Sequence, residues 1–143
     1  MKITIITIGK PQLSFVKDAI VEYTKRITRF ADVVLLHIKE DKKSTEKVLK
    51  LCEKKFVILL DEKGSQFSSQ GLADFLEQKN IQSQNLCFII GGPDGHDPEV
   101  EKRADYILSM SKLTFPHDIA TMLLIETLYR SLSILAGHPY HRV

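Results

Sequence analysis

The stretch LCFIIGGPDG, residues 86–95, decides the fold class of this chain. Its first half, Leu86–Ile90, is an uninterrupted apolar run, and such a run bounded by turn residues predicts a fully buried strand. Its second half, Gly91–Gly95, combines Gly, Pro and Asp and therefore predicts a tight turn at the carboxyl end of that strand. A strand without a polar face is typical of a parallel sheet that helices cover on both sides.

Apolar segments of the same kind lie on both sides of this stretch. Further strands are predicted at Ile3–Ile8, Asp32–Ile38, Phe56–Leu60 and Tyr106–Met110. Between them, apolar residues recur at helical spacing after candidate capping residues. These predicted helix starts are Ser14, Ser44 or Thr45, Ser68 or Ser69, Asp97 before Pro98, and Asp118. Strands that alternate with helices over 143 residues predict one α/β domain, residues 1–143.

The last predicted helix, from Asp118 to about Ala136, is unusually apolar for a helix of a small α/β domain. It is expected to end at Gly137, the residue type that most often stops a helix. Apolar side chains cover most of its circumference, whereas a surface helix normally buries a single stripe. We therefore expect one side of this helix to face the sheet and the other to face a second copy in a homodimer.

The composition resembles that of ordinary globular chains, with 43% hydrophobic and 27% charged residues. No apolar run approaches the roughly 20 residues needed to cross a bilayer, and the first residues lack the pattern of a signal peptide. We therefore expect a cytoplasmic protein that has no membrane contact. Twenty basic residues against 18 acidic ones give a net charge of +2, which does not by itself indicate a nucleic-acid binder.

Local patterns of charge and of possible metal ligands are weak. The lysine-rich segment Lys39–Lys55 is typical of a solvated helix face, with an RNA-binding face as the alternative. Cys52 and Cys87 form no CxxC pair, and both are predicted to be buried free thiols. No further ligands can be placed around the histidines, so we expect no metal site.

Three predicted strand ends carry glycine or polar residues, at the edge where parallel sheets bind ligands. They are Leu60–Gly64, where the third strand is expected to stop, Gly91–Gly95, and Ser111–His117. Glycine lets a ligand approach the backbone closely, although a plain tight turn also explains Gly91–Gly95. The chain contains neither GxGxxG nor GxxxxGK[ST], and no GxSxG elbow surrounds Ser111. Without these motifs, the sequence gives no support for a common dinucleotide site, a P-loop site or a serine hydrolase of the GxSxG type.

The carboxyl-terminal segment GHPYHRV, residues 137–143, is chemically rich for a chain end. It places an aromatic ring, two imidazoles and a guanidinium within five residues, behind a helix-stopping glycine. Such groups stack on bases and bind phosphate. A functional segment and a frayed tail are both compatible with this composition.

Four segments in combination resemble one known family. They are Ile89–Gly95, Leu113–His117, Glu126–Arg130 and His138–Arg142. Together they resemble the RlmH (YbeA-like) ribosomal RNA methyltransferases of the SPOUT superfamily, and the resemblance covers the whole chain. It implies a three-layer α/β/α SPOUT fold with a parallel sheet and a deep trefoil knot in the carboxyl-terminal part, and it implies a homodimer.

The same resemblance implies an activity and a cofactor. The expected enzyme transfers a methyl group from S-adenosyl-L-methionine to N3 of a pseudouridine in the helix 69 loop of 23S ribosomal RNA, within the ribosome. A SPOUT-like transfer RNA methyltransferase and a non-enzymatic nucleotide-binding module are the alternatives. The sequence assigns no general base and does not say which subunit supplies the tail to each active site.

The resemblance also implies site residues. The cofactor-binding positions are Leu60, Gly91, and the adenine loop Met110, Ser111, Lys112, Leu113, Thr114 and Phe115. The catalytic positions are Tyr140, His141 and Arg142, which we expect to orient the target base and to stabilise its developing negative charge. In the adenine loop, the backbone of Met110 and Lys112 should matter more than their side chains. Arg26, Arg29 and the lysines of Lys39–Lys55 are candidate RNA contacts.

Overall fold

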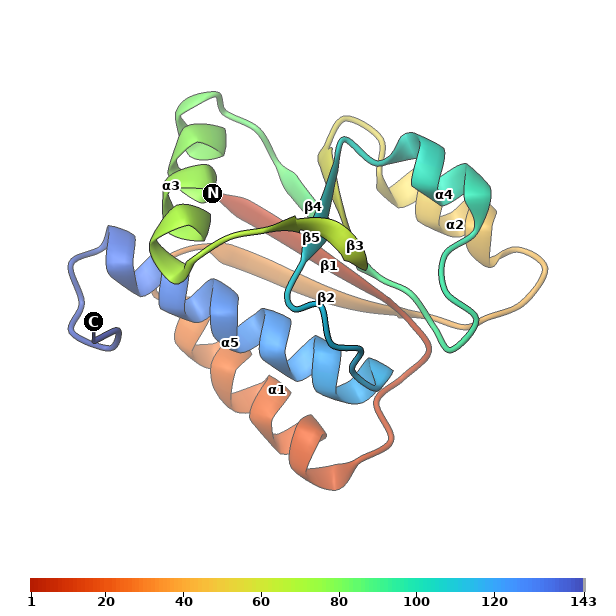
Figure 1. Cartoon of the computed structure of the whole chain (residues 1–143), viewed down its shortest axis with the longest axis horizontal. Helices are drawn as coiled ribbons and strands as arrows, with labels where there is room; N and C mark the ends of the chain where they lie inside the picture. Colours follow the sequence, from red (N-terminus) through yellow and green to blue (C-terminus); the bar gives the residue numbers. More distant parts are fainter. Residues whose placement is uncertain (143) are drawn as a thin grey trace.

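The computed structural model describes residues 1–142, so Val143 lies outside the described residues. Strands and helices alternate along the chain, as the apolar pattern predicts (Figure 1). In chain order they are β1 (Lys2–Ile8), α1 (Ser14–Ile27), β2 (Asp32–Ile38), α2 (Ser44–Leu51), β3 (Phe56–Gln66), α3 (Ser69–Ile81), β4 (Leu86–Ile90), α4 (Pro98–Arg103), β5 (Tyr106–Ser109) and α5 (His117–Leu135).

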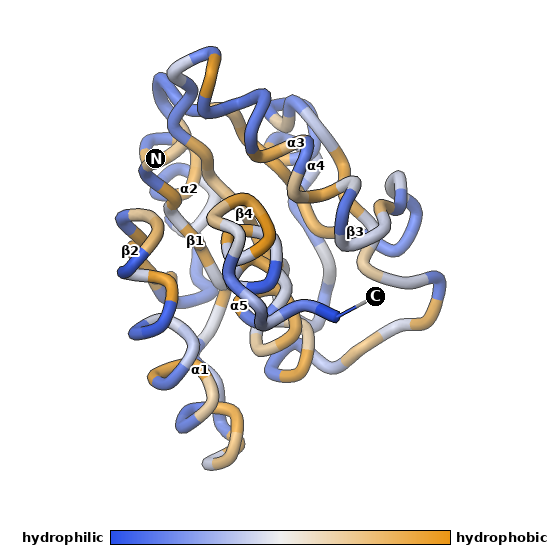
Figure 2. The backbone as a smooth tube through the Cα atoms, turned by 90° about the vertical axis from the view of Figure 1, so that its left-hand side faces the viewer, coloured by the Kyte–Doolittle hydropathy of each residue, from blue (hydrophilic) through white to orange (hydrophobic). Residues whose placement is uncertain are grey.

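The strands form one sheet in the order β2-β1-β4-β3-β5, and every pair in it is parallel. Helices α1, α3 and α5 pack on one face and α2 and α4 on the other (Figure 1). Hydrophobic residues concentrate in the central strands between these layers (Figure 2). The three-layer α/β fold is therefore confirmed, whereas the trefoil knot stays a prediction.

The stretch LCFII forms β4, whose five residues are all buried. Its side chains alternate between the two cores. Phe88 joins the α1/α3/α5 side, and Cys87 and Ile89 join the α2/α4 side. Cys52 lies in the same core as Cys87, and both are buried free thiols, as predicted.

Strand β3 is longer than predicted, because it continues beyond Asp61 to Gln66. The register shifts between Leu60 and Ser65, and both of these residues pair with Leu108 of β5. Gly64 makes this irregularity possible, since a Cβ there would lie 2.5 Å from the carbonyl oxygen of Ile107. The polar residues between the two paired parts predicted a turn, but the long-range pairing with β5 extends the strand.

Two predicted helix caps, one for α1 and one for α5, are wrong. Ser14 does not cap this helix, since the N-cap position is Leu13, which makes no side-chain capping bond. Asp118 does not cap its own helix either, since the N-cap of α5 is Pro116. The Asp118 carboxylate instead accepts hydrogen bonds from the backbone N–H groups of Gln12 (2.7 Å) and Leu13 (2.8 Å). A contact 105 residues apart in the sequence thus takes the place of a local cap.

The Asp118 contact predicts a pH-dependent stability. Burial opposes the charge of Asp118, but its hydrogen bonds from Leu13 and Gln12 outweigh burial, so its pKa lies below the ordinary value. The contribution of Asp118 to the free energy of unfolding is therefore fully present above the ordinary carboxyl pKa, and it is lost as the pH falls through the lowered pKa. We expect Asp118→Ala to reduce the free energy of unfolding at pH 7 by about 1–3 kcal/mol.

Urea unfolding at a series of pH values measures this effect. The deficit of the Asp118→Ala variant should shrink as the pH falls through the lowered pKa. Asp18→Ala, at an exposed position of α1, is the matched control and should leave stability within about 0.5 kcal/mol. An Asp118→Ala variant as stable as the control at pH 7 would contradict this role.

Candidate active site

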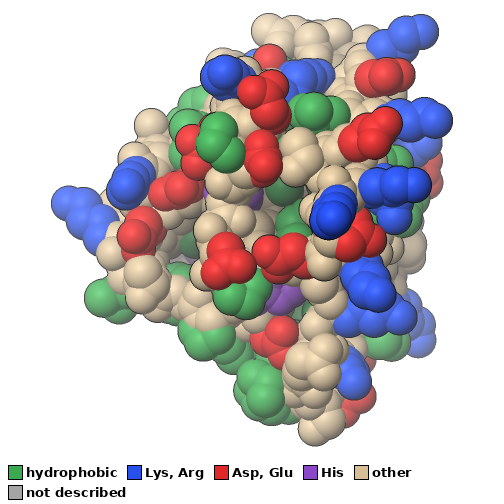
Figure 3. Space-filling view, turned by 90° about the vertical axis from the view of Figure 1, so that its right-hand side faces the viewer, with side chains coloured by type: hydrophobic (Ala, Val, Ile, Leu, Met, Phe, Trp, Pro, Cys, Tyr) green, Lys and Arg blue, Asp and Glu red, His purple; other side chains and the backbone are tan. Residues whose placement is uncertain are grey.

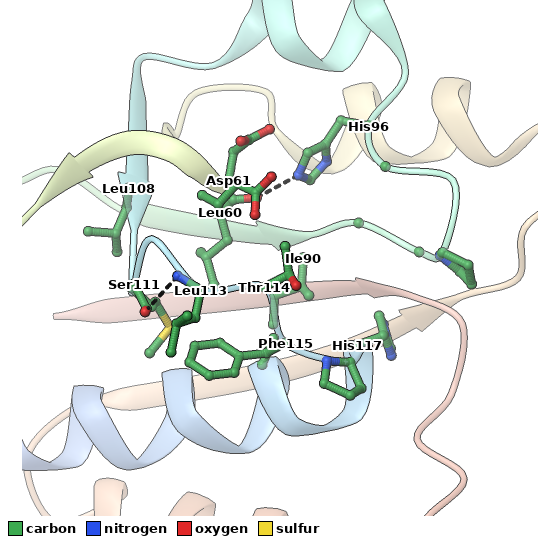
Figure 4. Close-up of a pocket in the computed structure, with 18 residues that line it drawn as sticks. Leu60, Asp61, Ile90, His96, Leu108, Ser111, Leu113, Thr114, Phe115 and His117 are labelled. Atoms are coloured by element: carbon green, nitrogen blue, oxygen red, sulfur yellow. Dashed lines mark hydrogen bonds between the residues drawn. The ribbon is translucent and has the colours of Figure 1, made fainter.

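The middle of β3 at residues 60–62, the loops that follow β4 and β5, and the first turn of α5 line a cavity of about 660 Å³ (Figure 4). That volume lies within the range of small-molecule and cofactor sites. Its lining residues are Leu60, Asp61, Glu62, Ile90, Gly91, Gly92, Pro93, Gly95, His96, Leu108, Met110, Ser111, Leu113, Thr114, Phe115, Pro116, His117 and Ala120. All the predicted cofactor positions except Lys112 are among them.

The β5–α5 loop is shaped by two serine hydroxyls. Ser109 at the end of β5 is buried, and its hydroxyl donates to the carbonyl oxygen of Ser111 at 2.9 Å. The hydroxyl of Ser111 in turn accepts from the backbone N–H of Leu113 at 3.0 Å. This short turn leaves Leu113 and Phe115 72% and 37% exposed, and both line the cavity (Figure 4). Two such exposed apolar side chains beside a cavity are suited to cover a ligand or a partner.

His96 belongs to the site, although the sequence did not single it out. Its Nε2 donates to the carbonyl oxygen of Leu60 at 2.7 Å, and it thereby ties the loop after β4 to the middle of β3 (Figure 4). The ring also explains Gly91, because a Cβ at Gly91 would lie 3.0 Å from both His96 and the carbonyl oxygen of Gly95. The only sequence signal for His96 is its position directly after the GGPDG turn.

His117 is the first residue of α5 and lines the cavity, but it makes no capping bond to its own helix. Its Nδ1 lies 3.5 Å from Asp118 Oδ1. Within residues 1–142, its buried Nε2 has no hydrogen-bond partner. His117 therefore places an unpaired imidazole nitrogen at the edge of the cavity.

The carboxyl-terminal segment is docked on α1 and α5 rather than frayed. Its Tyr140 hydroxyl donates to Glu126 Oε1 at 3.0 Å and lies 3.2 Å from the hydroxyl of Tyr23. The Tyr140 ring meets the Tyr129 ring edge-on, with 4.6 Å between the centroids. Burial, followed by the hydrogen bonds with Tyr23 and Glu126, raises the pKa of Tyr140, so this residue is a neutral phenol at neutral pH.

Arg130 connects the remainder of the segment to α5. Its guanidinium contacts Glu126 Oε1 at 2.6 Å and His141 Nδ1 at 3.1 Å. The side chain of Arg142, in contrast, is exposed. His138 helps to end α5 through its backbone, because its N–H donates to the carbonyl oxygen of Ser133 at 2.9 Å.

The two predicted groups of site residues do not meet within one chain. The cavity touches α5 in its first turn, as far as Ala120, whereas the tail binds Glu126 and Arg130. From Ala120 to Arg130 the helix rises by about 15 Å. Within the described part of the chain, none of Tyr140, His141 and Arg142 lines the cavity. The tail and the cavity lie toward opposite ends of α5 (Figure 1).

A parallel sheet with a ligand-sized cavity at the edge where its strands β4 and β5 end defines an α/β protein of a class that binds ligands at this edge. In residues 1–142, no three metal-ligating side chains are grouped to hold an ion. None of the helices described here is long and apolar enough to span a membrane.

A family model described as predicted SPOUT methyltransferase matches residues 1–141, and the chain belongs to this family. The chain is 39% identical to a protein of Deinococcus radiodurans over 99% of both chains, and 42% identical to one of Synechococcus sp. over 99% of this chain and 95% of the other. Both relatives are named ribosomal RNA large subunit methyltransferase H.

Solved structures support the fold at low sequence identity. A probable methyltransferase from Bordetella pertussis superposes with a TM-score of 0.56 at 9% identity, covering 92% of this chain and 95% of the other. The SpoU methyltransferase AviRb from Streptomyces viridochromogenes, in complex with the cofactor AdoMet, gives a TM-score of 0.50 at 11% identity. The match covers 96% of this chain and 58% of the other.

Proposed function

We propose that this protein is an S-adenosyl-L-methionine-dependent methyltransferase of large-subunit ribosomal RNA. The observation that carries the proposal is the cavity, which is lined by the strand-end residues expected to bind the cofactor. The names of relatives 39% and 42% identical over nearly the whole chain support the ribosomal substrate. The finer target, N3 of a pseudouridine in the helix 69 loop of 23S ribosomal RNA, follows from the resemblance of the four motifs. Such an enzyme acts in the cytoplasm, where ribosomes are.

The residues present fit this cofactor. An adenosine needs apolar cover for its ring and hydrogen-bonding groups at its edge. Leu60, Leu113 and Phe115 supply the apolar cover, and the backbone of residues 110–115 supplies N–H and C=O groups. Gly91 leaves the backbone open to close approach. S-adenosyl-L-methionine would supply, when bound, a methyl group on a positively charged sulfur for transfer to N3 of the base.

In this proposal the chain's own residues orient the target base. The tail carries a guanidinium and an imidazole, which can donate to the carbonyl oxygens of a uracil-like base and stabilise negative charge on it, whereas the proton of the Tyr140 phenol goes to Glu126. Arg142 is exposed and free to reach RNA, whereas Tyr140 and His141 are held in place by Glu126 and Arg130. Fixed alignment of base and methyl group is the main contribution an enzyme makes to such a displacement.

A homodimer brings tail and cavity together in this proposal. Since they lie toward opposite ends of α5, two copies related by a twofold axis with antiparallel α5 helices set the tail of one copy against the cavity of the other. Large hydrophobic side chains beside the cavity and at the start of α1 need cover: Leu13, Phe15, Leu113 and Phe115 are all exposed in a single chain. Hydrophobic side chains also gather along the lower edge of the face shown in Figure 3.

Transfer of labelled methyl groups tests the function. Purified ribosomes, isolated large subunits and bulk transfer RNA from cells lacking this protein are each incubated with the protein and labelled S-adenosyl-L-methionine. We expect label in the ribosomal material and N3-methylpseudouridine after nucleoside mass analysis. Label in transfer RNA would favour the alternative substrate, and cofactor binding without transfer to any of these RNAs would favour a non-enzymatic module.

A further inference from the structure

His141 has a fixed partner on one side of its ring. Its Nδ1 lies 3.1 Å from a guanidinium nitrogen of Arg130. A guanidinium carries only donors, so Nδ1 must be the acceptor of this hydrogen bond. In a neutral imidazole one ring nitrogen accepts and the other carries the proton. The Arg130 contact therefore selects the form of His141 that carries its proton on Nε2.

Arg130 is itself held in place. Its other terminal nitrogen contacts Glu126 Oε1 at 2.6 Å, one helical turn away on α5. The same carboxylate oxygen accepts from the hydroxyl of Tyr140 at 3.0 Å. Because the single Tyr140 proton goes to Glu126, the hydroxyl of Tyr23, at 3.2 Å, donates to Tyr140. One carboxylate thus fixes both the phenol and the arginine that adjoins His141.

The positions of these groups indicate a purpose beyond packing. The side chains of Glu126 and Arg130 are only 22% and 30% exposed, and the tail that they hold carries the groups proposed to contact the base. With Nδ1 facing Arg130, Nε2–H is the free hydrogen-bonding group of the neutral His141 ring.

We propose that Glu126 and Arg130 are positioning residues that fix His141 as the Nε2–H tautomer, so that His141 donates a hydrogen bond to a carbonyl oxygen of the target base and does not remove its proton. The inference rests on the proposed function for the identity of the base. The tautomer itself is a property of the protein alone.

Nitrogen NMR of the full-length protein labelled with ¹⁵N-histidine tests the tautomer without RNA or cofactor. At a pH above the titration of the ring, we expect Nδ1 of His141 to be unprotonated and Nε2 to be protonated. The signals that are absent from the spectrum of the His141→Gln variant are those of His141, and this comparison assigns them. Arg130→Met should produce a mixture of tautomers, whereas Arg29→Met, which removes an exposed arginine of the α1–β2 turn, should not. A protonated Nδ1 in the unmodified protein would overturn the proposal, as would a tautomer unchanged by Arg130→Met.

Two conservative variants of His141 test the donor role. The side-chain amide of Gln places an N–H near the position of Nε2, and that of Asn places one near Nδ1. We expect His141→Gln to keep kcat within about tenfold, and His141→Asn and His141→Ala to lose about a hundredfold or more. The KM for S-adenosyl-L-methionine should stay unchanged in all three. A His141→Gln variant as inactive as His141→Ala would indicate that His141 takes up the proton and would overturn the donor role.

The NMR measurement and the transfer assay together distinguish a failure of the positioning inference from a failure of the proposed function. If the unmodified protein transfers no methyl group to ribosomes but shows the Nε2–H form, the proposed substrate is wrong and the positioning by Arg130 stands. If transfer to ribosomes is robust but the Nδ1–H form dominates, the positioning inference is wrong and the function stands. If Arg130→Met fails to fold, the tautomer of the unmodified protein still decides the inference.

Discussion

Removal of residues 140–143 is expected to abolish methyl transfer to ribosomes while leaving binding of S-adenosyl-L-methionine close to its original strength. The cavity is lined by residues from Leu60 to Ala120 and by no tail residue within the described chain. The tail holds the groups proposed to orient the base, so its loss removes positioning and charge stabilisation together. We expect the transfer rate to fall by at least about a thousandfold. Calorimetric titration with the cofactor and a ribosome methylation assay measure the two effects.

A milder variant guards against loss of folding. Tyr140 packs against Tyr129 and bonds to Glu126, so the truncation also removes stabilising contacts. Arg142→Ala changes an exposed side chain instead and should leave the unfolding temperature unchanged. If Arg142 contacts the base or its phosphate, this single change should still reduce transfer by about a hundredfold. Full activity of the truncated chain would refute the role of the tail.

The sheet was predictable because its strands are apolar on both faces, and such runs are identified without knowledge of their partners. The end of β3 was not predictable, since the pairing of Ser65 with Leu108 outweighs the local turn preference of the residues after Leu60. Asp118 shows the same limit, because it binds the start of α1 from a position more than 100 residues away. Local patterns identify elements, whereas contacts between distant segments set their ends.

The cavity was predictable for a topological reason. In a parallel sheet all carboxyl strand ends share one edge, so the segments after β4 and β5 are brought together there. The predicted end of β3 joins them because the register of β3 shifts after Leu60. His96 could not be predicted from the sequence, because its role depends on the carbonyl group of Leu60, 36 residues away. The separation of tail and cavity could not be foreseen either. It depends on where the chain after Gly137 folds back, and the contacts with Tyr23, Glu126 and Arg130 decide that.

Mixing two inactive variants should restore activity, if the tail of one copy serves the cavity of the other. Gly91→Val is the cavity variant, because the Cβ alone would lie 3.0 Å from His96 and from the carbonyl oxygen of Gly95. Arg142→Ala is the tail variant. In a mixed dimer, one site combines the intact cavity of the Arg142→Ala chain with the intact tail of the Gly91→Val chain. The other site combines the altered cavity with the altered tail.

Random exchange of subunits makes half of the dimers mixed, and each mixed dimer has one intact site. We therefore expect about a quarter of the original activity in an equal mixture that is unfolded and refolded together, against almost none for either variant alone. A chain that carries both changes is the matched control, since its mixture with the unmodified chain should also give about a quarter. If tail and cavity of the same chain cooperate, the mixture of single variants stays inactive, whereas the control mixture rises to about half because every unmodified chain then retains its own site.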